Sequence, residues 1–267
     1  MPSTTSFFNG LYYEIAGEGQ PLVLIHGGLV NSGLWDDQFD GFAQRYRVLR
    51  YDVRGFGQST APNQPYSNHA DLKQLLDFLG IDKAYLIGLS MGGVIAIDFT
   101  LAYPDRVAAL VPVGPGLSGN PPSEYVRQGW ADVSAAYDRG EKDVAVELSL
   151  RLWTDGPNRT PDQVNKSARE RIRTMTAHEF ALPDYADNLL QGLEPPAYDR
   201  LGEIHVPTLL IVGGDDVPPI FETIDQLAAE VAGAKKVVIP GTAHHLNVEK
   251  PDEFNRVVLE FLGSLKR

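Results

Sequence analysis

Short aliphatic runs of strand length alternate with longer amphipathic segments through most of this 267-residue chain. The aliphatic runs are residues 22–25, 47–51, 85–87, 108–113, 208–212 and 236–239. Such alternation is what a parallel sheet with crossover helices requires. The chain is therefore predicted to fold as an α/β protein with a mostly parallel sheet flanked by helices. Pro112 weakens the prediction for its own strand, because proline withholds an amide donor.

The start of the chain predicts two further strands, which brings the expected sheet to eight. Asn9-Gly10 separates the apolar segments 7–8 and 11–15 and suits a two-residue hairpin turn, since both residues tolerate positive φ. Helices are expected over residues 71–80, 91–103 and 254–262, where apolar residues recur at helical spacing.

Residues 116–201 depart from this alternation of strand-length and helix-length segments. They contain no strand-like aliphatic run, and helical patches rich in Arg, Glu and aromatic residues replace it. Proline- and glycine-rich stretches at 115–122 and 194–196 bracket the segment. The prediction is one core built from residues 1–115 and 202–267, with residues 116–201 as a helical cap inserted into it.

Composition excludes several classes of function. The chain has 23 basic and 35 acidic residues, and its net charge of -12 argues against nucleic acid or an anionic membrane surface as partner. The absence of cysteine excludes disulfides, a thiolate nucleophile and cysteine-ligated zinc. The amino terminus lacks the pattern of a signal peptide and no apolar run approaches about 20 residues, so we expect a cytoplasmic protein. Nothing in the sequence indicates an oligomeric state.

The pentapeptide Gly88-Leu89-Ser90-Met91-Gly92 lies directly after a predicted strand and directly before a predicted helix. A strand that reverses sharply into a helix leaves no room for side chains two positions either side of the central residue. Such a turn holds the serine oxygen above the sheet, beside the positive end of the helix. Ser90 is therefore predicted to be a nucleophile, the alternative being a glycine-rich turn without chemistry.

A serine nucleophile needs a histidine base and an acid that orients the histidine. His244 and His245 both lie in the loop after the last predicted strand, and only one of two adjacent loop residues is expected to face the serine. Asp215 and Asp216 follow strand 208–212 at the same edge of the sheet. Asp216 is the better candidate for the acid, because an aspartate at the position of Asp215 more often forms a turn or caps a helix.

Two backbone amides are expected to form an oxyanion hole. One belongs to Met91, which follows the nucleophile, and the other to Gly28, where the missing side chain lets the amide approach a substrate oxygen closely. His26 opens the same loop and is interpreted as a structural residue that bonds to neighbouring loops.

The chain order Ser90, Asp216, His244 is that of the α/β-hydrolases. The motifs at 26–28, 51–59, 88–93, 213–216 and 241–244 resemble those of bacterial members of this family, and the likeness extends over nearly the whole chain outside the insertion. The resemblance implies that His244 is the base, Asp216 the acid, and Asp52 and Arg54 structural. The chain departs from the family at Val217-Pro218-Pro219, which is shorter than the usual stretch before the next helix.

These residues predict a serine hydrolase that cleaves a carboxylic ester of a small, partly apolar molecule through an acyl-enzyme, with no cofactor or metal. The sequence also resembles enol-lactone and acyl-homoserine-lactone hydrolases, so a lactone is the alternative substrate. Carbon–carbon bond hydrolases, cofactor-free haloperoxidases and a non-catalytic binding protein of the same fold are further alternatives. Six apolar residues of the insertion either line an acyl pocket or bury the cap: Trp130, Leu148, Leu152, Trp153, Met175 and Phe180.

Overall fold

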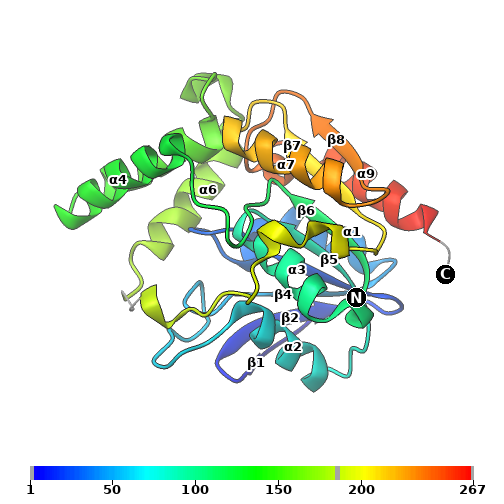
Figure 1. Ribbon diagram of the computed structural model, residues 1–267. Helices are drawn as coiled ribbons and strands as arrows, with labels where there is room; N and C mark the ends of the chain where they lie inside the picture. The colour runs from blue at the N-terminus through cyan, green and yellow to red at the C-terminus, as the bar shows by residue number, and fades with distance from the viewer. Residues whose placement is uncertain (1–2, 184–186, 266–267) are drawn as a thin grey trace.

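A computed structural model describes residues 3–183 and 187–265, with side chains except for that of Asp187. Within these residues one eight-stranded sheet has the order β1-β2-β4-β3-β5-β6-β7-β8 (Figure 1). The strands are β1 Thr4–Phe8, β2 Leu11–Ala16, β3 Pro21–Ile25, β4 Arg47–Tyr51, β5 Ala84–Leu89, β6 Val107–Val113, β7 Leu209–Gly213 and β8 Lys235–Ile239. Strand β2 pairs antiparallel with β1 and β4, and all other pairs are parallel. The prediction of a mostly parallel eight-stranded sheet is confirmed.

The predicted hairpin turn at Asn9-Gly10 and the predicted strand that contains Pro112 are both present in the structure. Asn9 and Gly10 both adopt positive φ, at 48° and 79°, and close the β1–β2 hairpin as expected. Pro112 lies inside β6 and pairs in register with Gly88 on β5. On its other side β6 meets the β7 region through Leu110–Thr208 and Val113–Ile211, so Pro112 is accommodated between two pairing points.

Helices cover both faces of the sheet, so most parallel strands are apolar on both sides. The helices α2 Asn68–Phe78, α3 Met91–Ala102 and α7 Pro218–Glu230 pack on one face. The helices α1 Asp36–Ala43 and α9 Pro251–Ser264 pack on the other. Strand β3 shows the alternation: Val23 and Ile25 join the first core, and Leu22 and Leu24 the second. No described helix combines the length and apolar character that crossing a membrane requires.

Three helices are inserted after β6, namely α4 Glu124–Asp138, α5 Lys142–Ser149 and α6 Lys166–Glu179, which lie together to one side of the sheet (Figure 1). A π-helical turn over Leu150–Asp155, labelled η3, continues α5. The remaining elements are α8 Leu246–Glu249 and the short 3₁₀ turns Ser32–Trp35, Pro104–Arg106, Pro161–Gln163, Asp187–Leu189, Ala197–Asp199 and Leu201–Glu203.

The chain leaves and re-enters the core at one bonded junction. The Ser118 hydroxyl donates to Asp98 on α3 at 2.6 Å and accepts the Ala197 amide at 2.9 Å. The Tyr198 amide donates to the carbonyl of Ser118 at 3.0 Å. Burial of Asp98 raises the pKa of its carboxyl to about 6, although the Ser118 hydrogen bond and Arg200 oppose the shift. The outgoing and returning segments are thus tied to each other and to the helix that follows Ser90.

Candidate active site

Ser90 occupies the sharp turn between β5 and α3. Its backbone has φ 55° and ψ -115°, a left-handed conformation that costs a non-glycine residue on the order of 1–3 kcal/mol. A Cβ at Gly88 would lie 2.0 Å from the Gly92 carbonyl oxygen, and a Cβ at Gly92 would lie 2.2 Å from that of Ile25. Since real Cβ atoms do not approach this closely, glycine is required at both positions.

The two predicted oxyanion donors lie beside this turn. The Met91 amide belongs to the first turn of α3, where N–H groups have no acceptor within the helix. Gly28 lies in the loop after β3, and a Cβ there would meet no atom within 4 Å, so the space above it is open. Both residues line space that Ser90 also lines. Leu29, the next residue, has a positive φ of 56°, which shows that this loop is conformationally constrained.

His26 holds the Gly28 loop in place. Its Nε2 accepts the Val53 amide at 2.9 Å, which leaves Nδ1 to donate to the Gly27 carbonyl at 2.7 Å. Complete burial lowers the pKa of His26, so the ring is neutral, in agreement with one accepting and one donating nitrogen. The side chain is fully engaged in fixing two loops.

His244 and Asp216 form a buried pair at the carboxyl edge of the sheet. His244 Nδ1 lies 2.9 Å from Asp216 Oδ2 and 3.2 Å from Oδ1. The second ring nitrogen, Nε2, is buried without a hydrogen-bond partner among the described residues. Because His244 lines the same pocket as Ser90, an imidazole with an unpartnered nitrogen and a serine hydroxyl share one space.

His245 and Asp215, the alternative candidates for the base and the acid, interact with other residues. His245 Nδ1 lies 3.1 Å from the Thr154 hydroxyl, and burial together with His244 lowers the pKa of its ring to about 3. Asp215 Oδ2 is 4.0 Å from Arg159 Nε, and its carboxylate is partly exposed. The structure therefore brings His244 and Asp216 together, and places the side chains of His245 and Asp215 outside this pair.

The short connection between Asp216 and helix α7 is compatible with the position of the Asp216 carboxylate beside His244. Helix α7 begins at Pro218, and prolines are tolerated in the first helical turn because their missing amides have no acceptor there. The Val217 amide donates to Asp216 Oδ1 at 2.8 Å. The tight connection thus supplies an extra hydrogen bond that holds the carboxylate toward His244.

Trp153 reaches the histidine from the insertion. Its carbonyl accepts the His244 amide at 3.2 Å, and its ring centroid lies 4.6 Å from that of His244 with an interplanar angle of 38°. The sequence suggested Trp153 only as a possible pocket residue. Its contact with the histidine joins residues 91 positions apart, and no local pattern signals it.

Arg159 and Glu249 were not anticipated from the sequence. The guanidinium makes two hydrogen bonds to the carboxylate, at 2.7 and 3.0 Å, and both side chains are nearly buried. Glu249 Oε1 also accepts the Ala243 amide at 2.8 Å, and Arg159 Nη1 donates to the Gly241 carbonyl at 3.2 Å. An arginine of the insertion therefore fixes the loop that presents His244.

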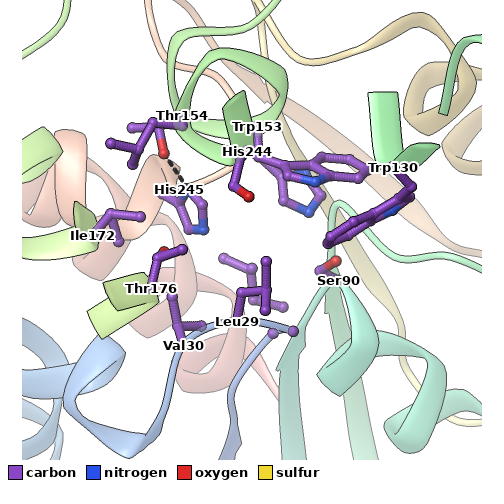
Figure 2. A pocket seen from close by; sticks show the side chains of 15 residues that line it. Leu29, Val30, Ser90, Trp130, Trp153, Thr154, Ile172, Thr176, His244 and His245 are labelled. Atoms are coloured by element: carbon purple, nitrogen blue, oxygen red, sulfur yellow. Dashed lines mark hydrogen bonds between the residues drawn. The ribbon is translucent and has the colours of Figure 1, made fainter. Parts of the chain in front are cut away.

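Ser90 lies between two spaces that share Gly28, Trp130 and Trp153. The first, termed the inner pocket, has a free volume of about 50 Å³ and is shown in Figure 2. Besides the shared residues it is lined by Gly27, Leu29, Val30, Leu89, Ser149, Leu150, Thr154, Ile172, Thr176, His244 and His245. The second, termed the outer cleft, has about 500 Å³ and is also lined by Met91, Val94, 116–117, 120–123, Val126, 219–220, Glu222 and Thr223.

The other apolar residues singled out from the insertion have different surroundings. Leu148 and Leu152 line a separate surface groove, although Leu152 also joins the core. Met175 and Phe180 pack against the second core. Only the two tryptophans of that set line the space around Ser90.

Comparison with known proteins agrees with this fold. Residues 20–251 match the family described as alpha/beta hydrolase fold. The chain therefore belongs to the α/β hydrolase fold family. A 2-hydroxy-6-oxononadienedioate/2-hydroxy-6-oxononatrienedioate hydrolase of Comamonas testosteroni is 30% identical over 272 residues, covering 95% of this chain and 91% of the relative.

Two solved structures extend the comparison to lactone-degrading proteins. Est816, described as an N-acyl homoserine lactone degrading enzyme, is 28% identical with a TM-score of 0.74, over 97% of this chain and 100% of the other. The enol-lactonase from Burkholderia xenovorans LB400 is 27% identical with a TM-score of 0.74, over 98% and 100%. Proteins similar to this chain thus include a hydrolase and lactone-degrading enzymes that are named for different substrates.

Proposed function

We propose that this protein is a serine hydrolase that cleaves an uncharged carboxylic ester of a small molecule through an acyl-enzyme. The observation that carries the proposal is the buried His244–Asp216 pair, in which His244 lines the same pocket as Ser90 and its Nε2 has no hydrogen-bond partner among the described residues. In this scheme residues 116–201 act as a cap over the site. Neither a metal nor a cofactor enters the reaction.

Each residue has one task in the proposed reaction. Ser90 Oγ attacks the ester carbonyl carbon while His244 Nε2 takes its proton, and Asp216 stabilises the resulting imidazolium. The amides of Gly28 and Met91 stabilise the oxyanion. His244 then gives the proton to the leaving alcohol. Water, deprotonated by His244, attacks the acyl-enzyme, and the acid departs as Ser90 regains its proton.

The charge of the site favours an ester over the substrates of some relatives. Among the described residues that line the inner pocket and the outer cleft there is no Lys or Arg, and Glu222 lines the cleft. The Comamonas relative is named for a dioate, a molecule with two carboxylates. A carboxylate placed in a site without a cation would be poorly stabilised. Hydrolysis of a carbon–carbon bond in such an anion is therefore disfavoured here.

A lactone is the second candidate, because a cyclic ester is uncharged and reacts through the same steps. The lactone-degrading proteins among the structural neighbours support it. The two candidates differ in the fate of the alcohol, which stays attached to the acyl-enzyme when a lactone opens. Rates on a set of open-chain esters and lactones of matched carbon number distinguish them.

A fluorophosphonate probe tests the nucleophile. We expect the purified protein to be labelled at Ser90, the variant S90A to be unlabelled, and the exposed control S264A to be labelled like the wild type. The same three proteins are then assayed on neutral esters such as ethyl butyrate. Equal labelling of S90A would overturn the assignment of the nucleophile, and labelling without turnover of any ester or lactone would overturn the proposed reaction.

A further inference from the structure

The two spaces around Ser90 differ in size and access, which bears on how an ester lies in the site. The inner pocket has a free volume of about 50 Å³, which leaves room only for a small group. The outer cleft is about ten times larger, at 500 Å³. A leaving alcohol must depart before water attacks the acyl-enzyme, whereas the acyl group stays. The acyl group therefore suits the inner pocket and the alcohol the outer cleft.

The inner pocket is not uniformly apolar. Leu29, Val30 and Ile172 form part of its wall, and polar side chains of Thr154 and His245 lie on the side away from Ser90 (Figure 2). The Thr154 side chain is fully buried and His245 is 6% exposed. Buried polar groups are normally retained only where they have partners. The proposed acyl transfer uses neither of them.

His245 is held in one orientation toward this pocket. Its Nδ1 is 3.1 Å from the Thr154 hydroxyl, and Figure 2 shows the other ring nitrogen turned away from Thr154 into the space bordered by Leu29, Val30 and Thr176. The strongly lowered pKa keeps the ring neutral. A neutral imidazole offers one donor and one acceptor, so the pocket-facing nitrogen is one or the other according to which way the Thr154 bond runs.

We infer that His245 is a specificity-determining residue, and that the inner pocket receives a short acyl group that carries a hydroxyl group on its second or third carbon. A hydroxyl can donate to or accept from the ring nitrogen, so it satisfies His245 in either tautomer. A carboxylate in the same place would face a neutral ring without a cation. The inference rests on the proposed ester hydrolysis and names its acyl class.

The first test uses the wild-type protein and pairs of esters that differ by one oxygen. Hydrolysis of ethyl butyrate, ethyl 2-hydroxybutyrate and ethyl 3-hydroxybutyrate is followed by titration of the released acid. We expect at least one hydroxy ester to exceed ethyl butyrate in kcat/KM by about tenfold, the upper range for one hydrogen bond. We also expect ethyl hexanoate to be at least about tenfold slower than ethyl butyrate, whereas hexyl butyrate is tolerated.

The second test asks whether His245 carries the preference. The ratio of hydroxy ester to plain ester is measured within each variant, so a general loss of rate cancels. In H245L the ratio should fall below about two. The variant T154V preserves side-chain shape and removes only the partner of Nδ1, and should give an intermediate ratio. Fluorophosphonate labelling of Ser90 reports that each variant is folded.

The outcomes separate this inference from the proposed function. If ethyl butyrate is hydrolysed but every hydroxy ester reacts at the same rate in the wild type, the inference is wrong and the ester reaction stands. A tenfold preference that is unchanged in both H245L and T154V would equally remove His245 from its role. If Ser90 is labelled yet no ester of either kind is hydrolysed, the proposed function fails and the inference falls with it.

Discussion

The turn that holds Ser90 and the loop that holds His244 reach their positions by different means. The turn is fixed by close backbone approaches around Gly88 and Gly92 within the core. The histidine loop is bonded by residues from the insertion, through Trp153 and Arg159. The turn of Ser90 therefore depends on glycines within its own pentapeptide and on the Ile25 backbone beside it, whereas the loop of His244 depends on residues about 90 positions away in the chain. Variants that weaken one support at a time test this difference.

The largest effect is expected where the proposed base His244 meets the proposed acid Asp216. In D216N the amide cannot stabilise the imidazolium at His244, so we expect kcat on ethyl butyrate to fall about 1,000- to 10,000-fold with little change in KM. Steady-state kinetics measure the loss. The control D215N changes a partly exposed neighbour outside the pair and should stay within about threefold of the wild type. A larger loss in D215N than in D216N would reverse the assignment of the acid.

The next effect concerns the support from the insertion. In R159A the nearly buried carboxylate of Glu249 loses both guanidinium bonds, and removal of one partner of a buried pair costs about 3–5 kcal/mol. Unfolding in urea measures the free energy, and kcat should fall as well because the loop before His244 is freed. R127A removes an exposed arginine of the same insertion whose partner Glu124 is also exposed, and should cost about 1 kcal/mol or less. Equal losses in the two variants would contradict a special role for Arg159.

The turn itself is tested by G92A. The new Cβ would need to move the Ile25 carbonyl, which lies 2.2 Å away and precedes the loop of Gly28. A shift of about 1 Å in catalytic geometry costs on the order of 100-fold in rate, so at least that loss is expected. In G41A the Cβ meets no atom within 4 Å on helix α1, and the stability should stay equal or rise by up to about 1 kcal/mol. Wild-type activity of G92A would show that the close approach is not required.

The contrast between the two supports also explains what the sequence could predict. The sheet follows from hydrophobic periodicity and the turn at Ser90 from the glycines around the serine, and both patterns are recognised within a few residues of sequence. Residue types alone left His244 beside His245, and gave Asp216 only a preference over Asp215, because neighbours in a loop share the same surroundings in the sequence. Spacing within the family favoured one member of each pair, and the structure places those two members together. Their catalytic roles stay predictions.

The insertion was predictable only as a helical segment. Its ties to the core, such as Arg159 to Glu249 and Ser118 to Asp98, pair ordinary polar residues far apart in the chain. Nothing near either residue marks it as buried, since burial is decided by how the whole insertion packs. The orientation of His245 toward Thr154 is a further case, because the two residues are 91 positions apart.

The smallest effect is expected at the junction where the insertion meets α3. The pKa of Asp98 is raised by burial to about 6 from an ordinary 3.8, so the folded state binds the proton more tightly than the unfolded state. Its contribution to stability is full below about pH 3.8 and is lost as the pH rises through about 6. As the pH rises between these limits, the free energy of unfolding of the wild type should fall by about 1–3 kcal/mol relative to that of D98N, whose side chain is neutral throughout.

Unfolding in urea at pH 4, 5, 6, 7 and 8 measures this difference. D98N should match the wild type at the lowest pH and exceed it in stability at pH 7 and above, with activity changed by no more than about threefold. D105N alters an exposed aspartate that follows the same helix and should track the wild type across the series. If the free energies of unfolding of wild type and D98N differ by the same amount at every pH, Asp98 is not protonated more readily in the folded state. The junction would then hold the insertion by hydrogen bonds whose strength does not change with pH over this range.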